Sequence, residues 1–136
     1  KVRTGSYFVV GMHIDFGVGY DYANNPVPNY QQFVALTKYK LSLLQKSVAN
    51  ARSVGSVKNP DGQAMASQVK NAIAKLNAGD PAGALTSINQ FINKVNSSTY
   101  YFPTSVTFNY NGDHLMRGEN IRFMLRVKVI PYKPVP

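Results

Sequence analysis

The first part of the chain alternates between apolar residues and small or polar ones. Over residues 7–22, one set of alternate positions is oily, and the intervening set carries His13, Asp15 and several glycines. Such alternation predicts a β-strand covered on one side only. An unbroken strand of this length would span about 50 Å. We therefore expect either a bend at Gly17 or Gly19, or a strand that reaches beyond its own domain. The apolar side comprises Phe8, Val10, Met12, Ile14, Phe16, Val18, Tyr20 and Tyr22.

The middle of the chain changes to a helical period. Apolar residues recur three or four positions apart through residues 30–53, which predicts one long helix. Two shorter helices are expected on either side of Gly79, because Gly79 suits a C-terminal cap, Asp80 an N-terminal cap and Pro81 a first helical position. A joint this short predicts an antiparallel hairpin. The predicted apolar stripes are Phe33, Leu36, Leu44, Val48 and Ala51, then Ala66, Val69, Ile73 and Leu76, then Leu85, Ile88, Ile92 and Val95, with Phe91 on the flank of the third stripe.

Alternation returns after Asn96. It predicts strands over residues 104–110 and 121–130, joined through the turn sequence Asn111-Gly112-Asp113 and a loop. In the last strand, alternate residues are expected to face inward (Ile121, Phe123, Leu125, Val127 and Val129) or outward (Arg122, Met124, Arg126, Lys128 and Ile130).

These elements predict an α+β fold. We expect a mostly antiparallel three- to four-stranded sheet, with a two- to three-helix insertion between the first strand and the last two strands. The chain is short enough for one domain, residues 1–136. Its parts are an N-terminal strand and connector (1–29), a helical unit (30–97), and C-terminal strands with a proline-rich tail (98–136).

One segment resembles a known family. Lys75-Leu76-Asn77-Ala78-Gly79-Asp80-Pro81-Ala82-Gly83-Ala84-Leu85, followed by Ile88-Asn89-Gln90-Phe91-Ile92-Asn93-Lys94-Val95-Asn96, is similar to the helical hairpin of the FIMAH family. The resemblance covers residues 68–96. FIMAH modules are appended to secreted bacterial proteins, so the resemblance implies a bacterial, extracellular origin and assigns no functional residue.

The net charge of the chain indicates which classes of partner it could bind. Fifteen basic residues against six acidic ones give a net charge of +9, and no carboxylate occurs between Asp21 and Asp61. Such a field attracts polyanions or an acidic neighbouring subunit, although a solvated basic surface without a specific partner has the same composition. The absence of cysteine excludes disulfides, thiolate zinc sites and a cysteine nucleophile.

Groups that could carry chemistry are few. His13 and Asp15 would lie about 7 Å apart on one face of the first strand, where a solvated surface pair explains them better than a catalytic pair. Residues 109–113 offer oxygens beside His114, but a calcium loop needs more carboxylates. Gly17-Val18-Gly19 lacks the third glycine and the following helix of a dinucleotide site. We therefore predict no enzyme activity, no metal site and no cofactor.

The basic residues near the C-terminus form the remaining candidate group. Arg122, Arg126, Lys128 and Lys133 follow one another on or after the predicted last strand. They are candidates for contact with a polyanion or another subunit, and cations on an edge strand also prevent unwanted strand pairing.

The sequence thus predicts a non-catalytic structural or assembly subunit of an extracellular surface appendage or a virion. Self-association would use extended strands, chiefly Phe8, Val10, Met12, Ile14 and Phe16. Its expected partners are copies of itself or other structural subunits. The alternative is a basic module that binds an acidic polymer, either nucleic acid or an acidic glycan. No apolar run is long enough to predict a transmembrane segment.

Overall fold

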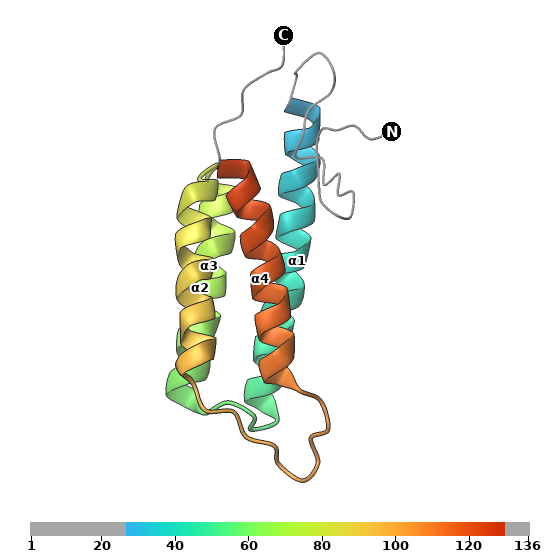
Figure 1. Ribbon diagram of the computed structural model, residues 1–136, viewed down its shortest axis with the longest axis vertical. Helices are drawn as coiled ribbons and strands as arrows, with labels where there is room; N and C mark the ends of the chain where they lie inside the picture. Colours follow the sequence, from blue (N-terminus) through green and yellow to red (C-terminus); the bar gives the residue numbers. More distant parts are fainter. Residues whose placement is uncertain (1–26, 130–136) are drawn as a thin grey trace.

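The part of the chain that the structure describes is a bundle of four antiparallel helices. The computed structural model describes residues 27–129, with side chains for residues 32–127. Its elements are α1 (Val27–Ser53), α2 (Asn59–Asn77), α3 (Pro81–Ser97) and α4 (Tyr110–Val129). Each helix packs against two neighbours, because α4 returns to α1 and closes a ring of contacts α1–α2–α3–α4 (Figure 1).

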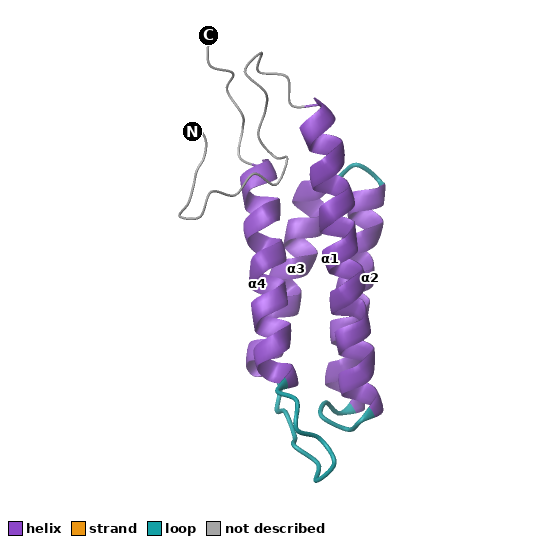
Figure 2. Cartoon of the chain, turned by 90° about the vertical axis from the view of Figure 1, so that its right-hand side faces the viewer, coloured by secondary structure: helices purple, strands orange, loops and turns teal. Residues whose placement is uncertain are grey.

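The two ends of the bundle differ. Connections 54–58 and 98–109 lie together at one end, which we call the loop end (Figure 2). At the other end lie the short 78–80 connection, the start of α1 and the end of α4 (Figure 1). The chain therefore enters and leaves the bundle at the end opposite the loop end.

One apolar core runs through the bundle, and all four helices contribute to it. Phe33 and Leu41 of α1, Val69 of α2, Phe91 of α3 and Leu125 of α4 are fully buried in it. The predicted stripes of the first three helices are largely confirmed. Their buried members are Phe33, Leu44, Val48, Ala51, Val69, Leu76, Ile88, Ile92 and Val95, whereas Leu36, Ala66, Ile73 and Leu85 are only partly buried. Phe91, expected on a flank, is fully buried as well.

The predicted hairpin joint between α2 and α3 is confirmed. Gly79 has a positive φ of 78°, a conformation that costs glycine less than any other residue. The carboxylate of Asp80 caps α3 by accepting a 2.8 Å hydrogen bond from the backbone N–H of Gly83, and Pro81 follows in the first turn.

The predicted α+β fold is wrong for the described residues. Within residues 27–129 there is no strand, so neither the sheet nor strand addition has a basis there. Residues 104–109 belong to the 98–109 connection, and residues 121–129 are helical. The first predicted strand, including Phe8, Val10, Met12, Ile14 and Phe16, lies outside the described residues, as do His13, Asp15 and Lys133.

The start of α4 explains the error in the C-terminal part. Asn109 caps the helix, since its side-chain oxygen accepts a 2.9 Å hydrogen bond from the Gly112 N–H. The Asn-Gly-Asp sequence that suggested a hairpin turn is therefore the first turn of a helix. Asp113 belongs to that turn and donates its own N–H to the Asn109 carbonyl at 3.0 Å.

The rest of α4 buries a helical stripe. His114, Gly118, Ile121 and Leu125 recur at spacings of three and four, and all are buried. Gly118 permits close approach to α3, because a Cβ there would lie 3.1 Å from Ile92 Cγ1. Burial also departs from the predicted alternation, with Met124 fully buried and Phe123 44% exposed. Tertiary packing has overridden the β-propensity of the local sequence.

Candidate binding surface at the loop end

Few of the predicted site residues meet in space. Arg122 lies on α4, where it forms an ion pair with Glu119 at 3.2 Å, and Arg126 is exposed one turn further along. The side chain of Lys128 is outside the described set. The prediction that these basic residues lie on a strand is therefore wrong. Helical spacing nevertheless keeps Arg122 and Arg126 on one side of α4.

Ser47, Asp113 and Arg117 form a polar network between α1 and α4, close to the loop end. The hydroxyl of Ser47 donates to Asp113 Oδ2 at 2.6 Å. The Nε of Arg117 donates to both oxygens of that carboxylate at 3.0 Å. Only 8% of the Asp113 side chain is exposed, and a buried carboxylate needs such partners. The network joins α1 and α4 next to the loop end.

A second polar contact holds the long 98–109 connection. The hydroxyl of Tyr100 and Nδ1 of His114 share a hydrogen bond of 2.7 Å, and the same hydroxyl lies 3.6 Å from the sulfur of Met65. The His114 ring is fully buried among aromatic rings, with centroids at 5.7 Å for Tyr100, 6.0 Å for Tyr110 and 6.1 Å for Phe91. Tyr100 therefore anchors the connection to α2 and α4.

Burial disfavours the charged form of both groups. Desolvation is the largest effect and lowers the pKa of His114. The Ser47 backbone and the charge of Asp113 oppose it, and the charge of Arg117 adds a smaller lowering effect. Burial, and secondarily the charge of Asp61, raises the pKa of Tyr100. In the described part of the chain, Nε2 of His114 is buried without a hydrogen-bond partner. The pair is a neutral contact inside the protein.

The two loops are also joined directly. The backbone N–H of Tyr101 donates to the carbonyl of Ser56 at 2.8 Å, which links connection 98–109 to connection 54–58. The ammonium of Lys58 lies 5.0 Å from the centroid of the Tyr101 ring, a cation–π contact. Gly55, with a φ of 82°, makes the turn between α1 and α2.

Exposed apolar side chains gather on these joined loops. Phe102 is 61% exposed and Phe108 is 50% exposed, and Val54 and Tyr101 are about two-fifths exposed. We call these four residues the loop-end surface. Aromatic residues are enriched in the energetically dominant parts of protein interfaces.

Ser47, Asp113 and His114 are residue types found in nucleophilic triads, but their bonds differ from those of a triad. Ser47 donates to the carboxylate, and His114 is bonded to a phenol. A triad requires the serine hydroxyl bonded to the histidine. Among the described residues there is also no group of three potential metal ligands. These contacts hold α1, α4 and the 98–109 connection together beside the loop-end surface.

Sequence reasoning missed this arrangement. The sequence predicts a turn at Asn111-Gly112-Asp113 and a strand over residues 104–110, whereas the structure has the first turn of α4 and part of the 98–109 connection there. One available signal was the cluster of aromatic residues from Tyr100 to Tyr110, because a strand would have buried half of them while a loop exposes several.

Comparisons with protein-family models, curated proteins and solved structures give no match for this chain. The similarity of residues 68–96 to the FIMAH hairpin therefore remains a prediction from those residues. No helix among the described residues is long and apolar enough to cross a membrane.

Proposed function

We propose that the chain is a non-catalytic assembly module that docks onto an acidic protein partner through its loop-end surface. The observation that carries the proposal is the grouping of Phe102, Phe108, Tyr101 and Val54 at the end of the bundle opposite the chain's entry and exit. A module built in this way presents these loops at the end opposite residues 27 and 129. The FIMAH resemblance favours an extracellular setting for such an assembly.

The exposed rings supply the energy for docking. Burying one phenylalanine side chain contributes about 1.5–3 kcal/mol. Phe102 and Phe108 are among the most exposed large apolar residues in the described range. Their loops are held by the Tyr100–His114 and Tyr101–Ser56 bonds, so less conformational entropy is lost when a partner binds.

Charge selects the class of partner. All four carboxylates in the described residues (Asp61, Asp80, Asp113 and Glu119) form ion pairs with basic side chains. Lys58 borders the surface at Tyr101. Two copies of a chain with a net charge of +9 repel one another, whereas an acidic partner is attracted. We therefore favour a different, acidic subunit over a second copy.

Selection from a displayed library of random peptides tests the proposal. We expect enrichment of peptides that combine Asp or Glu with aromatic or large aliphatic residues. The double variant Phe102→Ser/Phe108→Ser should weaken their binding by at least about tenfold, in line with the loss of two central aromatic contacts. The matched control is Tyr39→Ser, because Tyr39 is 60% exposed on α1, away from the loops.

Three results would contradict the proposal. The enriched peptides could be basic, or their binding could survive the double variant. Sedimentation could instead show a dimer that the double variant dissociates, in which case the partner would be a second copy.

A second candidate function, binding of an acidic polymer, has its own supporting observation. Helix α1 carries Lys38, Lys40, Lys46 and Arg52 and contains no carboxylate. Such a helix attracts a polyanion, with a strong dependence on salt. On a heparin column, Lys46→Gln should lower the salt needed for elution more than Lys70→Gln, since Lys70 is an exposed lysine on α2. Equal shifts would indicate attraction by net charge alone.

A further inference from the structure

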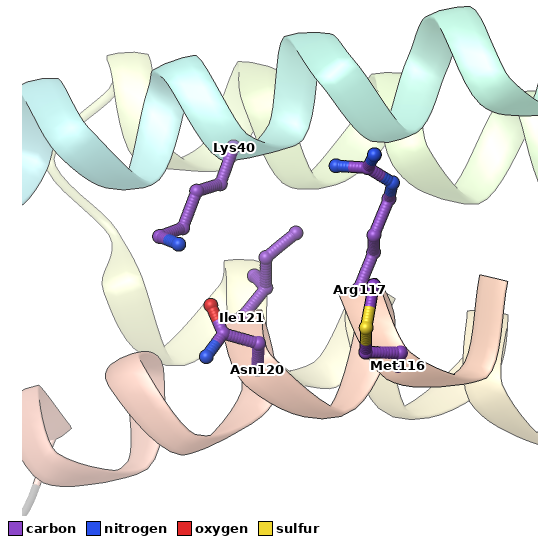
Figure 3. A pocket seen from close by; sticks show the side chains of 5 residues that line it. All are labelled: Lys40, Met116, Arg117, Asn120 and Ile121. Atoms are coloured by element: carbon purple, nitrogen blue, oxygen red, sulfur yellow. The ribbon is translucent and has the colours of Figure 1, made fainter. Parts of the chain in front are cut away.

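A shallow hollow lies between α1 and α4, apart from the loop-end surface. It has a volume of about 250 Å³ and is lined by Lys40, Met116, Arg117, Asn120 and Ile121. Figure 3 shows Lys40 reaching from α1 toward Asn120, Arg117 reaching from α4 toward α1, and Ile121 between them. Lys40 and the first residue of the 54–58 connection are about 20 Å apart along α1.

The polar groups of this hollow offer more hydrogen-bond donors than acceptors. Lys40 is half-buried, and its ammonium has no carboxylate partner among the described residues. Arg117 uses Nε for Asp113, and its two terminal nitrogens make no hydrogen bond within the described part of the chain. The amide of exposed Asn120 adds a further donor.

The charge of the hollow defines the ligand group. Asp113 compensates Arg117 across 3.0 Å, which leaves the single positive charge of Lys40 unmatched. A singly charged oxyanion balances that charge, whereas a doubly charged phosphate would bring an uncompensated negative charge onto a partly apolar surface. The planar fork of Arg117 also suits the two oxygens of a carboxylate.

The apolar wall defines what the oxyanion is attached to. Ile121 is 1% exposed and forms the inner wall, while the exposed Met116 forms the outer side. These side chains can contact the carbon atoms of a ligand while the donors hold its charged end.

From this geometry we propose that the α1–α4 hollow binds the carboxylate of an organic acid, with Lys40 as the charge partner and Arg117 and Asn120 as orienting donors. The site is separate from the loop-end surface and does not depend on docking there. It also differs from diffuse polymer attraction, because it requires particular donors and saturates with a single small ligand.

Nuclear magnetic resonance titration of the whole chain tests this site. The probes are sodium glucuronate, N-acetylglutamate amide and inorganic phosphate, added at constant ionic strength. We expect saturable shifts of the Asn120 side-chain amide and the Arg117 Nε–H with at least one carboxylate, and weaker binding of phosphate. The tighter of the two carboxylates identifies the source as a sugar acid or an acidic amino acid.

Matched variants make the test specific. Lys40→Met should weaken carboxylate binding by about tenfold, as expected for loss of a charge-assisted hydrogen bond. Asn120→Ala, a change at an exposed position, should weaken it less. Lys70→Met, which removes an exposed lysine on α2, should leave binding unchanged.

Several results would overturn the proposal. They are the absence of saturable shifts with both carboxylates, tighter binding of phosphate, or equal loss in Lys40→Met and Lys70→Met. Failure of peptide docking or heparin retention would leave the hollow unaffected, because neither assay measures binding of a small carboxylate.

Discussion

At the scale of single residues, the Tyr100–His114 contact joins the longest connection of the bundle to its core. Tyr100 lies in the 98–109 connection and His114 in the first turns of α4. The 2.7 Å bond between them links the connection to Nδ1 of the His114 ring. Loss of this bond leaves Nδ1 of a buried ring without a hydrogen-bond partner.

The variant Tyr100→Phe tests this contact. We expect the free energy of unfolding to fall by about 1–3 kcal/mol, the usual cost of leaving a buried polar group unsatisfied. Urea denaturation measures the change. Tyr39→Phe is the control, since Tyr39 is 60% exposed. Removing its hydroxyl should change the free energy of unfolding by less than about 0.5 kcal/mol. Similar losses in both variants would show that the buried bond contributes nothing.

The depressed pKa of His114 makes stability depend on pH. The unfolded chain binds a proton on this histidine near its ordinary pKa of 6.5, whereas the folded chain resists it. Full stability is therefore present above that pH and declines as the pH falls toward the lower, folded-state pKa. We expect denaturation midpoints to decrease between about pH 7.5 and 5.5.

Two histidine variants separate the cause of this dependence. His114→Gln should flatten the pH profile, even if it lowers stability at every pH. His13→Gln changes the chain's other histidine and should retain the slope. A slope that survives in His114→Gln would assign the pH dependence to a different group.

At the scale of elements, the α2–α3 joint shows local sequence determining local structure. Asp80→Ala removes the side-chain acceptor of the Gly83 N–H and should destabilise the protein by about 1 kcal/mol. Asp80→Asn keeps a capping oxygen and should cost less. Because the ion pair of Asp80 with Lys75 is exposed and 3.9 Å long, its loss in both variants should matter little. Thermal denaturation measures the difference, and equal losses would contradict the capping role.

The same joint and α4 show how far sequence reasoning reaches. Gly79, Asp80 and Pro81 each have a strong local preference, and together they predicted the hairpin correctly. In α4, Ile121 and Leu125 fit both a two-residue and a helical period, so the period alone was ambiguous. The expected strand rested on the two-residue alternation of Ile121, Phe123, Leu125, Val127 and Val129, which burial in α4 does not follow.

The signal that resolves the ambiguity lies upstream. His114 and Gly118 extend the stripe of Ile121 and Leu125 by two turns, but neither is a conventional core residue. His114 can lie in the core because Tyr100 shares a hydrogen bond with its ring. Gly118 lies in the core because Ile92 of α3 packs closely against it. Both contacts are tertiary, and for this reason the candidate surface was also beyond sequence reasoning.

At the scale of the whole molecule, the positive charge is spread over all four described helices, whereas the apolar residues of the loop-end surface are grouped at one end. Lys38, Lys40, Lys46 and Arg52 are distributed along and around α1, whereas Phe102 and Phe108 lie on the 98–109 connection at the loop end. A partner that contacts only the loop end is attracted by the overall field and held by the apolar contacts. Salt should therefore slow its association more than it speeds its dissociation.

The placement of both chain connections at one end has a mechanical consequence. Tension applied through residues 27 and 129 pulls α1 and α4 apart at their neighbouring tips, so their contacts break one turn after another. Tension between residue 27 and the loop end stretches α1 lengthwise and loads many contacts at once. Because the chain has no cysteine, handles can be attached at Val27→Cys with Val129→Cys, or at Val27→Cys with Val54→Cys. Optical tweezers should record a lower rupture force for the first pair than for the second.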